Sequence, residues 1–119
     1  MQQVECLHEM AIEKFGGLHG IRDRGLLESS VIQPQHVYYY GRGDLFDIAA
    51  AYAFHIAEAQ AFFDGNKRAA IAAAIAFLRS NGINTNFDSL PLYDAMMAVA
   101  EKRLSRSELA DLLRRLAGS

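Results

Sequence analysis

The residues best suited to chemistry lie together in one short segment, Asp64-Gly65-Asn66-Lys67-Arg68. Gly65 can adopt a positive φ and let the backbone approach a ligand closely. If a helix begins here, its first N–H groups carry partial positive charge, and Lys67 and Arg68 add two full charges at the same end. An arginine can bind two phosphate oxygens at once, whereas a lysine acts as a point charge. The segment therefore predicts a phosphate site made by Gly65, Asn66, Lys67 and Arg68.

Asp64 adds a carboxylate directly before this turn. Hard cations bind oxygen ligands together with substrate phosphates, so Asp64 could hold the divalent cation that accompanies a nucleotide. A second interpretation uses the same residues in a solvated helix start, with Asp64 as the cap and both cations on the surface. The residue types alone leave these two interpretations open.

The elements that position this segment are predicted to be helices. Apolar residues at helical spacing, with turn and capping residues between them, predict six helices: about 4–15, 23–33 stopped by Pro34, 44–60, 66–80 ending at Asn81-Gly82, one starting near Pro91, and one starting at a capping box of Ser105 and Glu108. Short extended pieces at 38–40 and 84–86 would form at most a minor hairpin. The predicted fold is a compact all-α bundle, with the alanine-dense helix after Asn66 at its centre.

Composition limits the class of protein. The chain has 119 residues, 51% of them hydrophobic, which suits one globular domain over 1–119. A formal net charge of −2 disfavours an all-helical DNA-binding protein, and we expect no direct nucleic-acid partner. No apolar stretch is long enough for a membrane span, and the single Cys6, expected to be buried, suits a reducing cytoplasm.

The segment from Gln60 to Arg68 resembles the motif of the Fic/Doc (Fido) superfamily, His-x-Phe-x-[Asp/Glu]-Gly/Ala-Asn-[Gly/Lys]-Arg. Phe62 and every residue from Asp64 to Arg68 match it, and the Lys67-Arg68 ending is the form of the Doc, or death-on-curing, branch. The likeness continues upstream through 15–23 and downstream through 77–82, so it covers most of the chain.

The resemblance implies a Fido fold, with ATP and Mg²⁺ as cofactors. It implies transfer of a phosphoryl group, as in Doc, or a nucleotidyl group, as in Fic, to a hydroxyl of a protein such as elongation factor Tu. The chain would then be the toxin of a toxin–antitoxin pair, held by a cognate antitoxin. Family roles place Asp64 at the metal and the target hydroxyl, Asn66 and the loop amides at phosphate, and Lys67 and Arg68 as phosphate-binding charges.

The motif departs from the family at one position, because Gln60 stands where the family has its general-base histidine. A neutral amide can position a hydroxyl but cannot accept a proton near pH 7. Gln60 therefore predicts either a weakened transferase or a catalytically inert nucleotide- or protein-binding module. A natural glutamine and one introduced into a toxic protein would have opposite functional meanings.

No other histidine is an obvious replacement for the missing base. His55 lies five positions earlier, about 140° around the helix from Gln60. His19, in the glycine-rich loop, is the better outside candidate because loops can fold over a site. His8 belongs to no recognisable motif.

Overall fold

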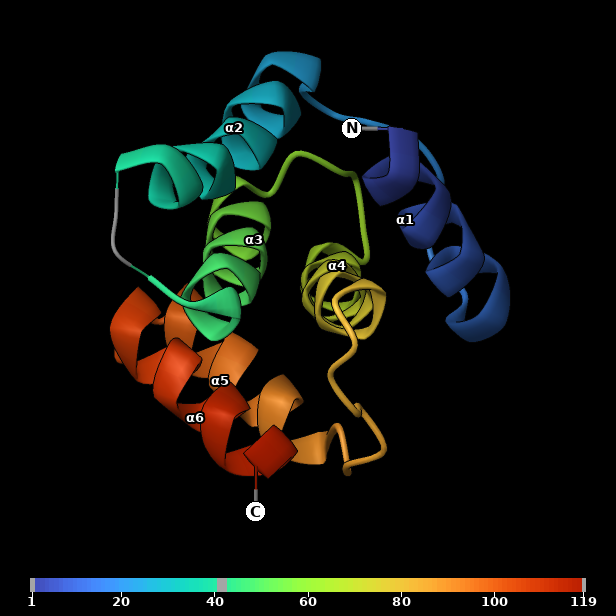
Figure 1. The fold of residues 1–119 in the computed structure, drawn as a ribbon. Coiled ribbons are helices and arrows are strands. Elements are labelled where there is room, and N and C mark those ends of the chain that lie inside the picture. The colour runs from blue at the N-terminus through green and yellow to red at the C-terminus, as the bar shows by residue number, and fades with distance from the viewer. Residues whose placement is uncertain (1, 41–42, 119) are drawn as a thin grey trace.

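The computed structural model describes residues 2–40 and 43–118, and over these residues it is all-α. Six helices follow one another without a strand in the described part: α1 (Gln2–Phe15), α2 (Arg24–Tyr40), α3 (Leu45–Ala59), α4 (Asn66–Ser80), α5 (Leu90–Ala100) and α6 (Arg106–Gly118). Figure 1 shows α3 and α4 inside a surround of the other four. The predicted fold class and the number of helices are confirmed.

Helix α2 is longer than the sequence indicated. We expected Pro34 to stop it, but the helix continues through Pro34 to Tyr40. A proline inside a helix removes one hydrogen bond and crowds the preceding turn, at a cost of about 3 kcal/mol. Leu27, Ser30 and Pro34 recur at helical spacing and are all buried, on a helix that packs against α3. Burial of this face offsets the cost of the proline.

The minor hairpin does not form in the described residues. Residues 38–40 belong to α2, residues 84–86 are irregular, and Gly41 and Arg42 lie outside the described residues. The β-type pairing recorded is one isolated antiparallel bridge between Ile21 and Phe62. This bridge matters for the site, because it joins the loop after α1 to the loop before α4.

Helices α3 and α4 together form the centre of the fold (Figure 1). Helix α3 contacts α2, α4, α5 and α6, whereas α4 contacts α3, α1 and α5. Small side chains on both helices allow the close approach, and the buried alanines of this interface region are Ala49, Ala50, Ala53 and Ala57 on α3 and Ala69, Ala70, Ala73 and Ala74 on α4. The expectation that α4 is a central, buried helix is confirmed, since no residue from 66 to 78 is exposed; α3 shares this central position.

The predicted capping residues are largely in place. Asp44 and Asp47 form a capping box at the start of α3, and Ser105 and Glu108 form the predicted box at the start of α6. Two of the four leucines on α6, Leu109 and Leu113, are fully buried; Leu112 and Leu116 are half-buried against the same core. The last helix therefore closes the core.

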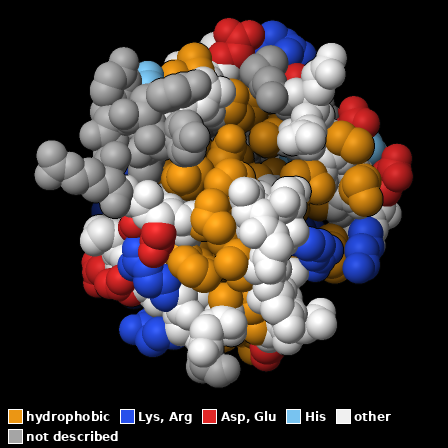
Figure 2. Space-filling model, in the orientation of Figure 1, with side chains coloured by type: hydrophobic (Ala, Val, Ile, Leu, Met, Phe, Trp, Pro, Cys, Tyr) orange, Lys and Arg blue, Asp and Glu red, His pale blue; other side chains and the backbone are white. Residues whose placement is uncertain are grey.

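Cys6 was expected to be buried and is instead exposed. The buried register of α1 runs through Val4, His8, Ala11 and Ile12, which leaves Cys6 at the edge of that face. There it lines a largely apolar groove of about 510 Å³ together with Leu7, Val31, Tyr52 and Phe77. Figure 2 shows apolar side chains gathered along the middle of the face that carries this groove.

None of the helices in the described part of the chain combines the length and the hydrophobicity that crossing a bilayer requires.

Candidate anion-binding site

Two left-handed residues shape the loop between α3 and α4. Gln60 ends α3 with φ 49° and ψ 45°, and Gly65 precedes α4 with φ 73° and ψ 22°. The positive φ predicted for Gly65 is confirmed. A Cβ atom at Gly65 would lie 3.0 Å from the Ile12 side chain and 3.5 Å from the His8 ring, so a larger residue would need this packing to shift.

The middle of the loop is anchored by Phe62 and Asn66. Phe62 is 2% exposed. Its backbone N–H donates to Asn66 Oδ1 at 3.0 Å, and Asn66 Nδ2 donates to the Phe62 carbonyl at 3.1 Å. Both polar atoms of the Asn66 amide are therefore bound within the loop. A contribution of Asn66 to phosphate binding would fall to its backbone N–H at the first turn of α4.

Arg22 holds the chain at Gln60. Its guanidinium donates to the Gln60 carbonyl from Nε at 3.1 Å and from Nη2 at 2.7 Å. The backbone N–H groups of Arg22 and Asp23 both donate to the Ala61 carbonyl, at 2.7 and 3.0 Å. These four hydrogen bonds fix the backbone at the position where the family places its general base. The side chain of Gln60 is left exposed at the rim of the site.

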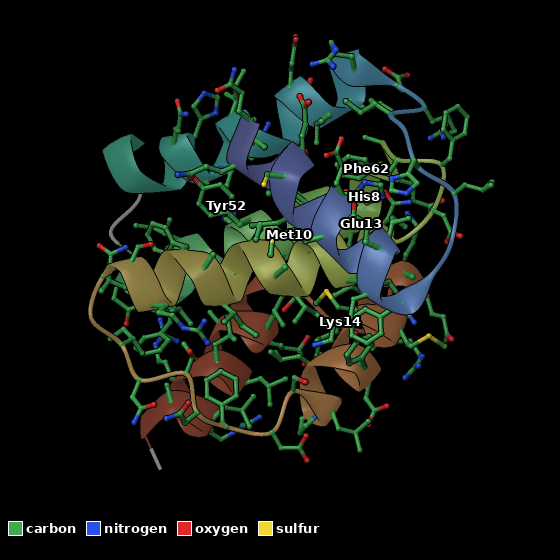
Figure 3. All side chains as sticks on the ribbon, turned by 90° about the vertical axis from the view of Figure 1, so that its right-hand side faces the viewer. His8, Met10, Glu13, Lys14, Tyr52 and Phe62 are labelled. Atoms are coloured by element: carbon green, nitrogen blue, oxygen red, sulfur yellow. The ribbon has the colours of Figure 1, made fainter. Side chains whose placement is uncertain are left out.

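His8 supports the same loop from α1. The ring is 1% exposed and stacks on Phe62, with centroids 3.8 Å apart and planes within 8°. Its Nε2 is hydrogen-bonded to the backbone carbonyl of Asp64. Figure 3 shows His8 and Phe62 together, between α1 and the loop that precedes α4. Position 8 lies one helical turn from Val4 and from Ile12, so its register was the sequence signal that it would be buried.

The carboxylate of Asp64 also binds backbone groups. Oδ1 accepts from the Gly65 N–H at 2.8 Å, and Oδ2 accepts from the Leu18 N–H at 3.3 Å. A Cβ atom at Gly17 would lie 2.7 Å from Asp64 Oδ2, so the glycine there leaves room for the carboxylate. Each oxygen keeps a further lone pair, and the side chain is exposed, so Asp64 can still reach a cation or a hydroxyl.

The first turn of α4 combines open N–H groups with two cations. No described side chain caps this helix, and its first backbone bond is the Ala69 N–H to the Gly65 carbonyl at 2.9 Å. Lys67 and Arg68 were expected to be exposed and are half-buried. The Arg68 guanidinium lies 4.6 Å from the ring centre of Phe15, a cation–π distance that restrains its direction.

These residues border one open cavity of about 430 Å³. All six residues that the sequence predicted for the site line it, namely Gln60, Asp64, Gly65, Asn66, Lys67 and Arg68. The other walls are Ala57 of α3, Phe63 of the loop, and Tyr93 and Ala100 of α5. Tyr93, Arg22 and His8 were missed by the sequence reasoning, because no local motif connects them with the loop.

None of the histidines named from the sequence, His8, His19 and His55, lines this cavity. His8 uses Nε2 inside the loop, and His55 lies near Arg106 at 3.5 Å, where burial lowers its pKa. His19, the candidate in the glycine-rich loop, is likewise not among the residues that line the cavity. Within the described residues, no three His, Cys, Asp or Glu side chains gather in a way that could hold a metal ion.

The fold thus brings an uncapped helix start, two cations and a carboxylate to one cavity, an arrangement suited to binding an anion. Residues 1–78 match the Fic/DOC family, and the chain belongs to that family. It is 40% identical over 119 residues to "Protein kinase doc" of Escherichia phage P1, covering 99% of this chain and 94% of that protein. It is also 40% identical over 102 residues to "Toxin Doc" of Mycolicibacterium smegmatis, covering 81% of this chain and 77% of that protein. These relatives place it in the Doc branch.

Proposed function

We propose that this chain is a Doc-type toxin that transfers a phosphoryl or nucleotidyl group from ATP to a hydroxyl of a protein. The observation that carries the proposal is the convergence of the α4 N-terminus, Lys67 and Arg68 on a cavity that also holds position 60. Phosphoryl transfer is catalysed largely by positioning and by charge stabilisation, which these groups are suited to supply. The names of the two relatives, a protein kinase and a toxin, support the same reaction class.

The residues at the cavity fit a nucleotide with its cation. Asp64 is the one carboxylate among the described lining residues. Magnesium is commonly held by one or two carboxylates, substrate phosphates and water, so a single Asp is a sufficient protein ligand. When bound, the cation would add charge stabilisation at the phosphates. Asp64 would hold it, while Lys67, Arg68 and the first N–H groups of α4 would bind phosphate oxygens.

Gln60 limits the chemistry of this site. Its amide can donate to and accept from a target hydroxyl, which orients the hydroxyl, but it cannot take up the proton. Loss of a general base lowers a rate by about 10² to 10⁴, while binding of ATP is retained. We therefore propose a weakened transferase. The alternative is a catalytically inert nucleotide- or protein-binding module, and Gln60 is the observation that favours it.

The proposed partners follow from the toxin class. One is a cognate antitoxin, and another is a protein substrate such as elongation factor Tu, as the likeness to Doc implies. We propose the cytoplasm as the location, since it supplies ATP and keeps Cys6 reduced.

Calorimetric titration with ATP and Mg²⁺ tests the binding part of the proposal. Lys67→Ala with Arg68→Ala should abolish detectable binding, because both phosphate-binding cations are lost. The matched control is Arg79→Gln with Arg115→Gln, which removes two cations at the far end of α4 and on α6 and should leave the affinity unchanged. Equal affinity in the Lys67, Arg68 variant and the unaltered chain would overturn the proposed site.

A further inference from the structure

We propose that His8 is a positioning residue of the anion-binding loop and sets the direction in which the Asp64–Gly65 peptide faces. The inference rests on the proposed function, because it treats this loop as the phosphate site. It adds a residue from α1, more than fifty positions away in sequence, to a site otherwise built from the end of α3 and the start of α4.

The side chain of His8 makes two distinct contacts. The ring face stacks on Phe62 at 3.8 Å, and the ring edge places Nε2 on the Asp64 carbonyl. A carbonyl oxygen only accepts, so Nε2 carries the proton and donates.

The contact has a consequence for the phosphate site. The C=O and N–H of a trans peptide point in opposite directions. Because His8 holds the Asp64 carbonyl toward the interior, the Gly65 N–H is turned outward, where it meets Asp64 Oδ1 at 2.8 Å. One buried donor thus orients both an N–H at the helix start and the carboxylate that lines the cavity.

If His8 only filled space in the core, its ring alone would be sufficient. His8 is packed beside Ile12 and Gly65, and an apolar ring of the same size would fill that space. Such a ring would leave the Asp64 carbonyl without its donor and free the peptide to rotate. The polar atom therefore distinguishes positioning of the loop from packing of the core.

Three variants test this difference. His8→Phe keeps the ring and removes the donor, His8→Gln keeps a donor of similar reach and removes the ring, and Glu9→Gln is a control on the exposed face of α1. Amide hydrogen exchange would be followed at Phe62 and Phe63, whose N–H groups bond to Asn66 and Gly20, with Leu78 as the reference for global opening. ATP affinity would be measured for each chain by calorimetry.

We expect His8→Phe to raise exchange at Phe62 and Phe63 relative to Leu78, and to weaken ATP binding, each by about three- to tenfold, as loss of one hydrogen bond predicts. His8→Gln should recover most of the affinity, and Glu9→Gln should change neither quantity. Affinity and local exchange in His8→Phe equal to those of the unaltered chain would overturn the inference. So would equal losses in His8→Phe and His8→Gln. If the unaltered chain fails to bind ATP, the proposed function fails, while the exchange contrast still decides the role of His8.

Discussion

At the scale of single residues, Gln60 combines an unusual side chain for its motif with an unusual backbone. Its φ of 49° lies in the left-handed region, which costs a residue with a side chain about 1 to 2 kcal/mol. Hydrogen bonds from Arg22 to its carbonyl hold this conformation. Position 60 is thus held through its backbone carbonyl by the side chain of Arg22, in the loop after α1.

Because of this strain, glycine substitutions at positions 60 and 58 should change the free energy of unfolding in opposite directions. Gln60→Gly should raise the free energy of unfolding by about 0.5 to 1 kcal/mol, because glycine adopts positive φ without steric cost, less the entropy it gains in the unfolded chain. Glu58→Gly, two positions earlier and exposed within α3, should lower it by about 1 kcal/mol. Urea unfolding of both variants measures the difference. A loss of stability in both would show that Gln60 is not strained.

At the level of helices, the sequence predicted where helices start better than it predicted where α2 ends or which side chains are buried. Asp44 and Ser105 carry local capping signals, and the structure confirms both. The prediction that Pro34 ends α2 was wrong because it considered only the local free-energy cost of a proline within a helix. The burial against α3 that offsets this cost is not visible in any local pattern. The prediction that Cys6 is buried was wrong because an apolar pattern defines the edge of a helix's buried face only to within one position.

The leucines of α6 test the same question of environment. Leu113→Ala should lower the free energy of unfolding by about 2 to 5 kcal/mol, since its side chain is fully buried and leaves a cavity. Leu112→Ala, one position away and half-buried, should cost less than Leu113→Ala, because a half-buried side chain leaves a smaller cavity. Chemical denaturation of the two variants gives the comparison. An equal loss at both positions would contradict the packing described for α6.

In the molecule as a whole, Arg114 links α6 to the start of α3 through ion pairs. Its guanidinium binds Asp44 through Nε and Nη2, both at 3.0 Å, and lies 2.8 Å from Asp47 and 2.7 Å from Asp111. Hydrogen bonding to Arg114 lowers the pKa of Asp44 from 3.8 to about 2. The contact spans 70 positions of sequence, which explains why no local pattern predicted it.

The lowered pKa fixes the sign of an acid-stability effect. A carboxyl whose folded pKa is depressed stabilises the fold above its unfolded pKa and loses this contribution as the pH falls through the folded value. The difference in unfolding free energy between the unaltered chain and Asp44→Asn should therefore shrink between about pH 4 and pH 2. Asp44 is about half exposed, so solvent screening limits the contribution to about 1 kcal/mol or less.

Denaturant unfolding at several pH values measures this difference. Asp94→Asn, which removes an exposed carboxylate on α5 that is not among the ion-pair partners of Arg114, is the control and should show no such change. A difference for Asp44→Asn that stays constant from pH 5 to pH 2 would contradict the role given to Arg114.

The residues of the candidate site could be predicted from the sequence more readily than the distant residues that hold the loop in place. Gly65, Lys67 and Arg68 are adjacent in sequence, so a helix start brings them together wherever it lies in the fold. Asn66 also lies there, but its side chain is bound within the loop, because the amide matches the N–H and C=O of Phe62. His8 and Arg22, which support the loop, come from distant segments of the sequence. The packing of α1 on α4 brings His8 to the loop, and no local pattern predicts this packing. That residues 1–119 form a single domain stays a prediction, which the shared core of the described helices supports.

Gln60→His distinguishes a transferase site that lacks only its general base from an inert nucleotide-binding site. The chain as given and the His variant would be incubated in lysate with ATP labelled on either the γ or the α phosphorus, which separates phosphoryl from nucleotidyl transfer. Protein labelling by the His variant should be about 10² to 10⁴ times faster, because an imidazole can accept the proton of the target hydroxyl. Adding Lys67→Ala and Arg68→Ala to the His variant should abolish the labelling. Equal rates in the two chains, or no labelling by either while ATP still binds, would contradict the account.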